Sequence, residues 1–227
     1  MACKQKNRKV TADGIHLQNF PNQQCKRGDK RRLAVKKSML MMCVALVFLI
    51  FAAGAGGEDK EILGVKFPAE KTVDGKTLKL NGVSHMKKLW IKVYAGGLYL
   101  ESPTQDPLEV IESEQTKQFY LHYLTDKATA EKLREGFVEM ITENNPPELV
   151  EKHKADIDKY ISWFDKGMAP GKTSVTTYVP GKGLTLEWQG EEKGTIPGKE
   201  FAQMYFRYTF GEKADAKLKK GYLGIEE

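Results

Sequence analysis

The sequence predicts an α+β fold: one large antiparallel β-sheet with a layer of helices packed on one face. Apolar and polar residues alternate in several segments between residues 62 and 123, which is the period of β-strands. From residue 133 the apolar residues recur at helical spacing instead, and a hairpin pattern and more helical patterns follow. Strands that precede helices in this way favour an antiparallel sheet with segregated helices.

The first strands are predicted from alternation and turn residues. Residues 62–67 alternate and end at Pro68, and residues 76–80 alternate after Asp74-Gly75, so we expect these two segments to pair as a hairpin. The next strand pattern places Leu89, Ile91, Val93 and Ala95 on one face and Trp90, Lys92 and Tyr94 on the other. Gly96 and Gly97 follow and would let a neighbouring element come close. Phe119, Leu121 and Tyr123 repeat the strand period, which puts His122 on the opposite face.

Two helices are predicted next. Apolar residues at 133, 137, 140 and 141 have helical spacing, and Thr129 is a suitable N-cap. Pro146 and Pro147 open a second helix, because proline is tolerated in a first helical turn. We expect that helix to run to about Phe164.

A hairpin and two more helices complete the predicted domain. Residues 175–179 and 184–188 alternate on either side of a Pro-Gly-Lys-Gly turn, and a short strand is expected near Thr195. A helix then begins after Gly198 and ends at Gly211, and a last short helix carries Leu218 and Leu223.

The N-terminal quarter of the chain differs from this domain in charge and hydropathy. Residues 1–37 hold 11 of the 36 Lys and Arg but only two of the 30 Asp and Glu, so the remainder of the chain is slightly acidic. The basic pI therefore gives no support for nucleic-acid binding by the domain. We interpret residues 1–37 as an irregular basic extension, with a true start at or near Met39 as the simplest explanation.

An uncharged apolar segment, residues 38–57, follows the extension. Its length and its small-residue end at Ala53-Gly54-Ala55 favour a signal peptide, residues 38–55, cleaved near Ala55. The alternative is an uncleaved membrane anchor, since 20 uncharged residues can just span a bilayer. We predict an exported protein, periplasmic or secreted, with a domain at residues 58–227 and membrane contact only through the apolar segment.

Residues that could carry chemistry are few. Cys3, Cys25 and Cys43 all precede the predicted cleavage point, so the domain has no disulfide, thiol nucleophile or cysteine metal site. The sequence holds no metal-binding histidine spacing and no phosphate-binding or nucleophile motif. We predict no metal and no cofactor. Lys87 and Lys88 are either carboxylate-binding groups or an ordinary charged strand end, and Trp90 and Tyr94 are either cavity walls or core.

Several motifs in order resemble the chalcone isomerase-like family, in particular its exported bacterial members. They are Gly64-Val65-Lys66-Phe67-Pro68, Asn81-Gly82, Lys92-Val93-Tyr94, Gly97-Leu98-Tyr99-Leu100, Gly194-Thr195-Ile196-Pro197-Gly198 and the run from Leu218 to Gly224. The resemblance covers residues 61–224. It implies an open-faced β-sandwich whose ligand cleft lies between the sheet and the helices.

The resemblance also implies positions for ligand-binding residues. The family's arginine falls on Met86, followed by Lys87 and Lys88, and its strand threonine falls on Tyr94, where tyrosine is usual in bacterial members. In the next helix the family's tyrosine falls on Thr129, its lysine on Lys132 and its asparagine on Gly136. The predicted ligand-binding set is therefore Met86, Lys87, Lys88, Trp90, Tyr94, Thr129 and Lys132.

Three functions remain open at this point. Plant chalcone isomerases cyclise chalcones with an arginine that stabilises the enolate, whereas other members bind fatty acids. Because methionine cannot stabilise an oxyanion, we favour a non-catalytic protein that binds an apolar or amphiphilic ligand such as a fatty acid. The alternatives are an isomerase (an intramolecular lyase) and an envelope protein that acts through a protein partner.

Overall fold

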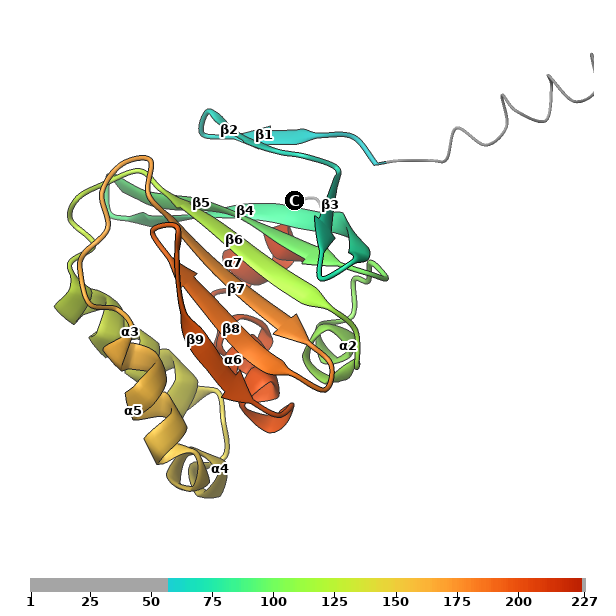
Figure 1. Ribbon diagram of the computed structural model, residues 1–227. Coiled ribbons are helices and arrows are strands. Elements are labelled where there is room, and N and C mark those ends of the chain that lie inside the picture. The colour runs from blue at the N-terminus through green and yellow to red at the C-terminus, as the bar shows by residue number, and fades with distance from the viewer. Residues whose placement is uncertain (1–56, 226–227) are drawn as a thin grey trace, which may run out of the picture. The chain divides into compact units, whose positions relative to one another are not determined.

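The computed structural model describes residues 57–225, which form one sheet, a small separate hairpin and a set of helices (Figure 1). The predicted basic extension, apolar segment and three cysteines lie outside the described residues. The large sheet is antiparallel, and its seven strands lie in their order along the chain. They are β3 (Glu70–Val73), β4 (Lys76–Lys88), β5 (Ile91–Leu100), β6 (Lys117–Tyr123), β7 (Thr173–Val179), β8 (Gly183–Trp188) and β9 (Glu191–Pro197).

The helices cover one face of this sheet, as Figure 1 shows for α6 and α7 behind the strands. They are α2 (Pro107–Glu112), α3 (Ala130–Glu143), α4 (Pro147–Lys152), α5 (Lys154–Ser162), α6 (Glu200–Phe210) and α7 (Ala216–Tyr222). Side chains of Asp106, Thr129 and Asp215 cap α2, α3 and α7, respectively, by accepting hydrogen bonds from backbone N–H groups of the first turn. The predicted α+β fold with an open-faced, helix-covered antiparallel sheet is therefore confirmed.

Strand β5 separates the two sides of the sheet. A side chain at Gly96 would collide with Tyr222 of α7, so the even-numbered positions of β5 face the helices. A side chain at Gly97 would instead meet Phe67, the last residue of the hairpin formed by β1 (Lys60–Ile62) and β2 (Val65–Phe67). The two glycines thus admit a close neighbour on each face, as the sequence predicts.

Helix α7 lies close against β4 because both elements carry glycine at the contact. A Cβ atom on Gly82 would lie 2.2 Å from the carbonyl oxygen of Gly221, and one on Gly221 would lie 2.7 Å from Oγ of Ser84. Backbone atoms cannot move aside as flexible side chains can, so Gly82 is required for this approach. Tyr222 and Leu223 are buried as a result.

Several predicted boundaries are wrong. Residues 80–100 contain most of β4, a two-residue turn and β5, rather than one strand that starts at Leu89. Residues 62–67 hold the tight β1–β2 turn, and residues 76–80 pair with β3, which alternation over only four residues did not reveal. The predicted helix after Pro146 is two helices, α4 and α5, joined at His153.

Candidate functional site

Six tyrosine side chains come together between the sheet and the helices. Tyr94 is on β5 and Tyr123 on β6, and their rings lie 5.6 Å apart. We call the tyrosine cluster the set made by these two and four helical residues: Tyr160 of α5, Tyr205 and Tyr208 of α6, and Tyr222 of α7. Five of the six are buried, and Tyr208 is partly exposed. Polar hydroxyl groups thus lie in the middle of the hydrophobic core.

The periods of the elements explain why these residues meet. Tyr94 and Tyr123 are paired in the β5–β6 register and so lie on the same, helix-covered face of the sheet. Tyr205 and Tyr208 are three residues apart on α6, which places both on one side of that helix. Helix α7 then brings Tyr222 over Gly96.

Aromatic rings surround the hydroxyl groups. The ring of Phe119 on β6 lies 4.9 Å from that of Tyr222 and stacks on Phe206 and Phe210. The ring of Phe137 on α3 stacks on Tyr160 and Tyr208. The cluster therefore combines aromatic side chains with a group of hydroxyls, a composition that suits a molecule that is mostly apolar with one polar end.

Burial sets the ionisation of these phenols. It raises the pKa values of Tyr94, Tyr160 and Tyr222 well above the usual value of 10.0, and the neighbouring phenols raise the pKa of Tyr94 and Tyr222 further because two nearby phenolates repel. The pKa of Tyr205 is raised as well, mainly by burial. The cluster consequently offers neutral O–H groups, which can donate hydrogen bonds but cannot act as a base near neutral pH.

One fully buried hydroxyl of the cluster lacks a well-formed hydrogen bond. Tyr160 shares a hydrogen bond of 3.0 Å with Oγ1 of Thr176 on β7. The hydroxyl of Tyr222 makes no well-formed hydrogen bond among the described residues, although the residue is only 2% exposed, and it interacts only weakly with the hydroxyl of Tyr94. Leaving such a group unsatisfied costs about 1–3 kcal/mol. Tyr222 therefore has an unused hydrogen bond to offer to a bound molecule.

Of the predicted site residues, Tyr94 belongs to this cluster and Met86 lies next to it. They face each other directly in the β4–β5 register. Met86 is partly buried and packs against the core. The position that the family resemblance assigns to an arginine thus lies beside Tyr94, on the helix-covered face.

The structure places Lys87, Lys88 and Trp90 elsewhere, at the exposed turn between β4 and β5. Both lysines end β4, and the Trp90 side chain is 84% exposed. Trp90 is therefore neither core nor a wall of the space between sheet and helices, because it is a turn residue and not part of β5. The predicted role of the two lysines in holding a carboxylate stays a prediction.

Thr129 and Lys132 lie at the start of α3. The Thr129 hydroxyl accepts a hydrogen bond from the backbone N–H of Lys132, so the predicted N-cap is confirmed. Both residues are exposed. Their predicted contact with a ligand stays a prediction.

Sequence reasoning missed most of the tyrosine cluster. The predicted helices included Tyr160, Tyr205 and Tyr208 without giving them a role, and Tyr222 had only a place in a motif. The sequence did contain one indication of the cluster: it has tyrosine at positions where phenylalanine would fill the same space. A buried tyrosine hydroxyl usually needs a hydrogen-bond partner, so such positions indicate a polar contact in the core.

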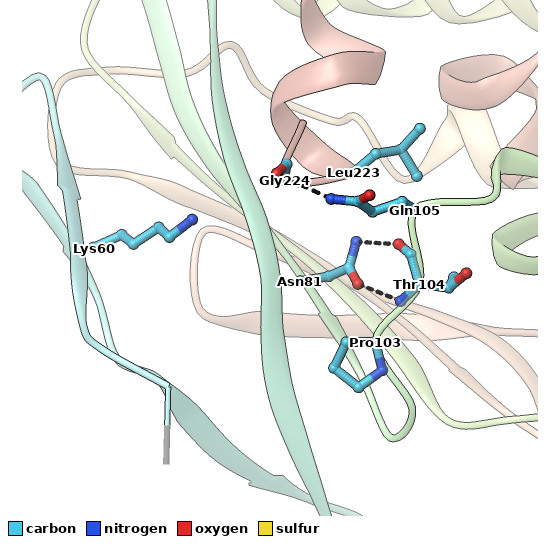
Figure 2. A pocket seen from close by; sticks show the side chains of 7 residues that line it. All are labelled: Lys60, Asn81, Pro103, Thr104, Gln105, Leu223 and Gly224. Atoms are coloured by element: carbon cyan, nitrogen blue, oxygen red, sulfur yellow. Dashed lines mark hydrogen bonds between the residues drawn. The ribbon is translucent and has the colours of Figure 1, made fainter. Parts of the chain in front are cut away.

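A surface hollow of about 400 Å³ lies where residues 103–105 and the C-terminal residues approach β4 (Figure 2). Asn81 lies at its centre. Its amide group donates to the carbonyl oxygens of Thr104 and Tyr222, and its side-chain oxygen accepts from the N–H of Thr104. Lys60 extends toward this hollow from β1. Because the polar atoms of Asn81 are already paired, we interpret the hollow as a structural junction.

Neither a metal-binding cluster nor a membrane-spanning helix is present in the part of the chain that the structure describes. Within residues 57–225, no three His, Cys, Asp or Glu side chains are placed to hold a metal ion. None of the helices in this part of the chain is both long and apolar enough to cross a membrane.

The fold and site define an α+β protein whose helix-covered sheet encloses an aromatic, hydroxyl-bearing interior. The chain belongs to the chalcone isomerase-like family, whose sequence profile matches residues 59–224. Among solved structures it is similar to a fatty-acid binding protein of Arabidopsis thaliana, with a TM-score of 0.59 and 18% sequence identity over 73% of this chain and 96% of that one. Comparison with curated proteins gives no match.

Proposed function

We propose that this protein binds an amphiphilic molecule of the fatty-acid type between the sheet and the helices and carries out no reaction on it. The observation that supports this most is the buried hydroxyl of Tyr222, which lies among aromatic side chains without a well-formed hydrogen bond. The structural similarity to a fatty-acid binding protein supports the same class of ligand. The polar end of the ligand would accept a hydrogen bond from Tyr222 and lie near Tyr94.

The phenols take the place of a cation in this proposal. Met86 occupies the position implied for an arginine, so the polar end of the ligand is held by neutral donors beside it. Burying a charged carboxylate without a cation is costly, which favours a protonated acid or another neutral polar end. The apolar tail would enter past the partly buried side chains at the margin of the core, Met86, Leu133 and Tyr208.

Replacing Tyr222 by phenylalanine tests the proposal. Tyr222→Phe should weaken binding of a fluorescent fatty acid about tenfold, the worth of one buried hydrogen bond. The variant should be as stable as the natural protein or more so, because an unsatisfied hydroxyl has been removed. Affinity and melting temperature are measured on the same samples.

Tyr99→Phe is the matched control. The Tyr99 hydroxyl is also buried without a partner, but the residue lies on the other face of the sheet, where Lys71 approaches its ring. This variant should change stability in the same direction and leave affinity unchanged. Equal affinities for the natural protein and Tyr222→Phe would reject the assignment of the polar end to Tyr222.

Met86→Arg tests the position of the ligand's polar end from the other direction. An arginine there would add a charge-assisted hydrogen bond to a carboxylate, which corresponds to about ten- to a hundredfold tighter fatty-acid binding. Lys87→Ala and Lys88→Ala should weaken carboxylate binding if those lysines take part, and leave a neutral ligand unaffected. A large loss of stability from Met86→Arg without a gain in affinity would exclude Met86 from the site.

Mass spectrometry of gently purified protein separates ligand binding from action through a partner. A co-purified lipid supports the proposal. Protein that consistently carries no lipid and does not take up fatty acid favours the partner instead.

We also propose that the domain is exported. The support is the order of basic, apolar and small residues between positions 36 and 55. N-terminal sequencing of the protein from its native cell should find a mature end near Gly56. A mature chain that retains residues 39–53 would show that the apolar segment is an anchor.

A further inference from the structure

The turn that joins β4 and β5 carries the two most exposed of the large apolar side chains in the described domain. Leu89 is 80% exposed and Trp90 is 84% exposed. We call residues 87–92 the hairpin tip; it carries Lys87 and Lys88 before these two residues and Ile91 and Lys92 after them. Single exposed apolar residues are normal, but an adjacent Leu and Trp at the end of a projecting hairpin form a compact apolar feature.

Folding alone does not account for the composition of this tip. Leu89 adopts a positive φ of 55°, a conformation that favours Asn or Gly in a two-residue hairpin turn. Lys87 and Lys92 stand directly opposite each other in the register. Like charges at such a position repel. The exposed apolar pair, the positive φ of Leu89 and the two opposed lysines would therefore each lower the stability of the domain in water.

The charge around the tip has a single sign. Residues 76–100 contain five lysines and no Asp or Glu. The loop after β6 lies beside the start of β5, where the N–H of Leu124 donates to the carbonyl oxygen of Val93. In that loop Asp126 is already paired with Lys127, so it does not offset the lysines of the tip.

We propose that the hairpin tip docks on the surface of an anionic lipid bilayer. Trp90 and Leu89 would enter the interface between head groups and acyl chains, the region that tryptophan prefers. The flanking Lys87, Lys88 and Lys92 would reach the lipid phosphates, since lysine can lie along an apolar surface with its ammonium group in the polar layer. This docking does not depend on the ligand proposed above, although Met86 and Tyr94 lie just behind the tip.

Collisional quenching tests the proposal on the full chain. The protein is reconstituted in vesicles of phosphatidylcholine and phosphatidylglycerol with brominated acyl chains, and its tryptophan fluorescence is recorded. Because Trp188 is buried and Trp163 packs against the core, the difference between the natural protein and Trp90→Phe isolates the signal of Trp90. We expect strong quenching of that signal. This readout reports on the tip itself, whatever the N-terminal apolar segment does in the bilayer.

Two variants keep Trp90 as the probe. Asparagine suits the positive φ of residue 89, so the melting temperature of Leu89→Asn should be unchanged or higher. Because the substitution removes apolar area, the membrane-inserted state should become at least tenfold less favoured. Replacing Lys87, Lys88 and Lys92 by serine should shift the same equilibrium by about fivefold per lysine. High salt should weaken quenching in the natural protein for the same reason.

The matched control replaces Lys213, Lys217 and Lys220 by serine, which removes the same charge from exposed positions in and before α7. It should leave the quenching of Trp90 unchanged. The proposal is overturned by equal signals from the natural protein and Trp90→Phe. Equal quenching in vesicles of phosphatidylcholine alone would likewise overturn it, because the lysines would then play no part.

Discussion

Tyr222 can place its hydroxyl in the core only because residue 96 is a glycine. A Cβ atom on Gly96 would lie 2.4 Å from that hydroxyl and 2.6 Å from Cδ2 of Leu121. The polar atom that we propose as the ligand donor thus depends on an absent side chain on the facing strand.

Gly96→Ala should therefore destabilise the protein by about 1–3 kcal/mol, the usual cost of overpacking a core. The double variant with Tyr222→Phe should recover part of the lost stability, because the contact between the added Cβ and the Tyr222 hydroxyl disappears. Gly136→Ala is the control: nothing lies near its missing Cβ in the middle of α3, so it should stabilise the protein by about 1 kcal/mol. Urea unfolding measures all three, and a Gly96→Ala protein of unchanged stability would contradict the packing described.

His153, between α4 and α5, is a second residue whose surroundings give a measurable effect. Its ring contacts Asp156 through Nδ1 at 2.9 Å and Glu200, the first residue of α6, through Nε2 at 2.7 Å. Burial of the ring lowers its pKa, but the hydrogen bonds and charges of the two carboxylates outweigh this, so the pKa is raised above 6.5. Protonated His153 therefore ties three helices together.

The sign of the pH dependence follows from that shift. Since the pKa is higher in the folded protein than in the unfolded chain, the stabilisation is complete below about pH 6.5 and is lost as the pH rises through the folded-state value. We expect His153→Gln to lower the melting temperature most at pH 5.5 and least at pH 9. Lys152→Gln, which removes an exposed ion pair to the same Glu200, should show a small and constant effect over this range.

At the scale of elements, α7 and the loop before α2 are joined to β4 by one side chain. Asn81 donates to two carbonyl oxygens and accepts from one N–H group. An aspartate at position 81 has the same shape and would still accept the hydrogen bond from the N–H of Thr104. Its second carboxylate oxygen would replace the amide NH₂ group and would repel the carbonyl oxygens of Thr104 and Tyr222.

Asn81→Asp should consequently lower the free energy of unfolding by about 2–4 kcal/mol at pH 7. Gln105→Glu is the appropriate comparison, because it makes the same chemical change on the exposed wall of the same hollow and should cost less than about 0.5 kcal/mol. Hydrogen exchange of the α7 amides would locate the damage. If the two variants proved equally stable, Asn81 would not be the link that its hydrogen bonds indicate.

Elements with a regular period were predictable, whereas β1 and β3, which have three and four residues, were not recognised. The alternation at 175–179 and 184–188 gave β7 and β8, and the helical spacing with Gly211 gave α6. The turn at Leu89-Trp90 was missed because it contains neither Gly, Asn nor Pro, and its apolar residues continue the strand pattern. Asn-Gly is a dipeptide typical of turns, but Asn81-Gly82 lies within β4 at a shift in the register, and its role depends on α7, far away in the sequence.

The candidate site was predictable only where the family resemblance pointed to it. The structure puts Met86 and Tyr94 on the helix-covered face, and their contact with a ligand stays a prediction. Tyr205 and Tyr222 were not recognised, because periodicity distinguishes a buried position from an exposed one but does not reveal that several buried hydroxyls converge.

At the scale of the whole molecule, the interior provides hydrogen-bond donors but no arginine at the place where the family's isomerases have one. We therefore expect no appreciable acceleration of chalcone cyclisation over the uncatalysed rate. Loss of one oxyanion donor typically costs about a hundred- to a thousandfold in rate. An absorbance assay with a simple hydroxychalcone measures this, with Met86→Arg run beside it. Robust turnover by the natural protein that is lost in Lys87→Ala or Lys88→Ala would make the isomerase function primary.

The contact between α7 and β4 also has a consequence for the order in which the chain can fold. The hydrogen bond from Asn81 to Tyr222 spans 141 residues, and the side chains of residues 222 and 223 complete the core above β4. While the protein is being synthesised, that part of the core stays open until residues 216–224 have left the ribosome. A chain exported as we propose would thus remain loosely folded during most of its synthesis, which keeps it able to thread through a translocation channel, and it would become fully folded only on the far side of the membrane.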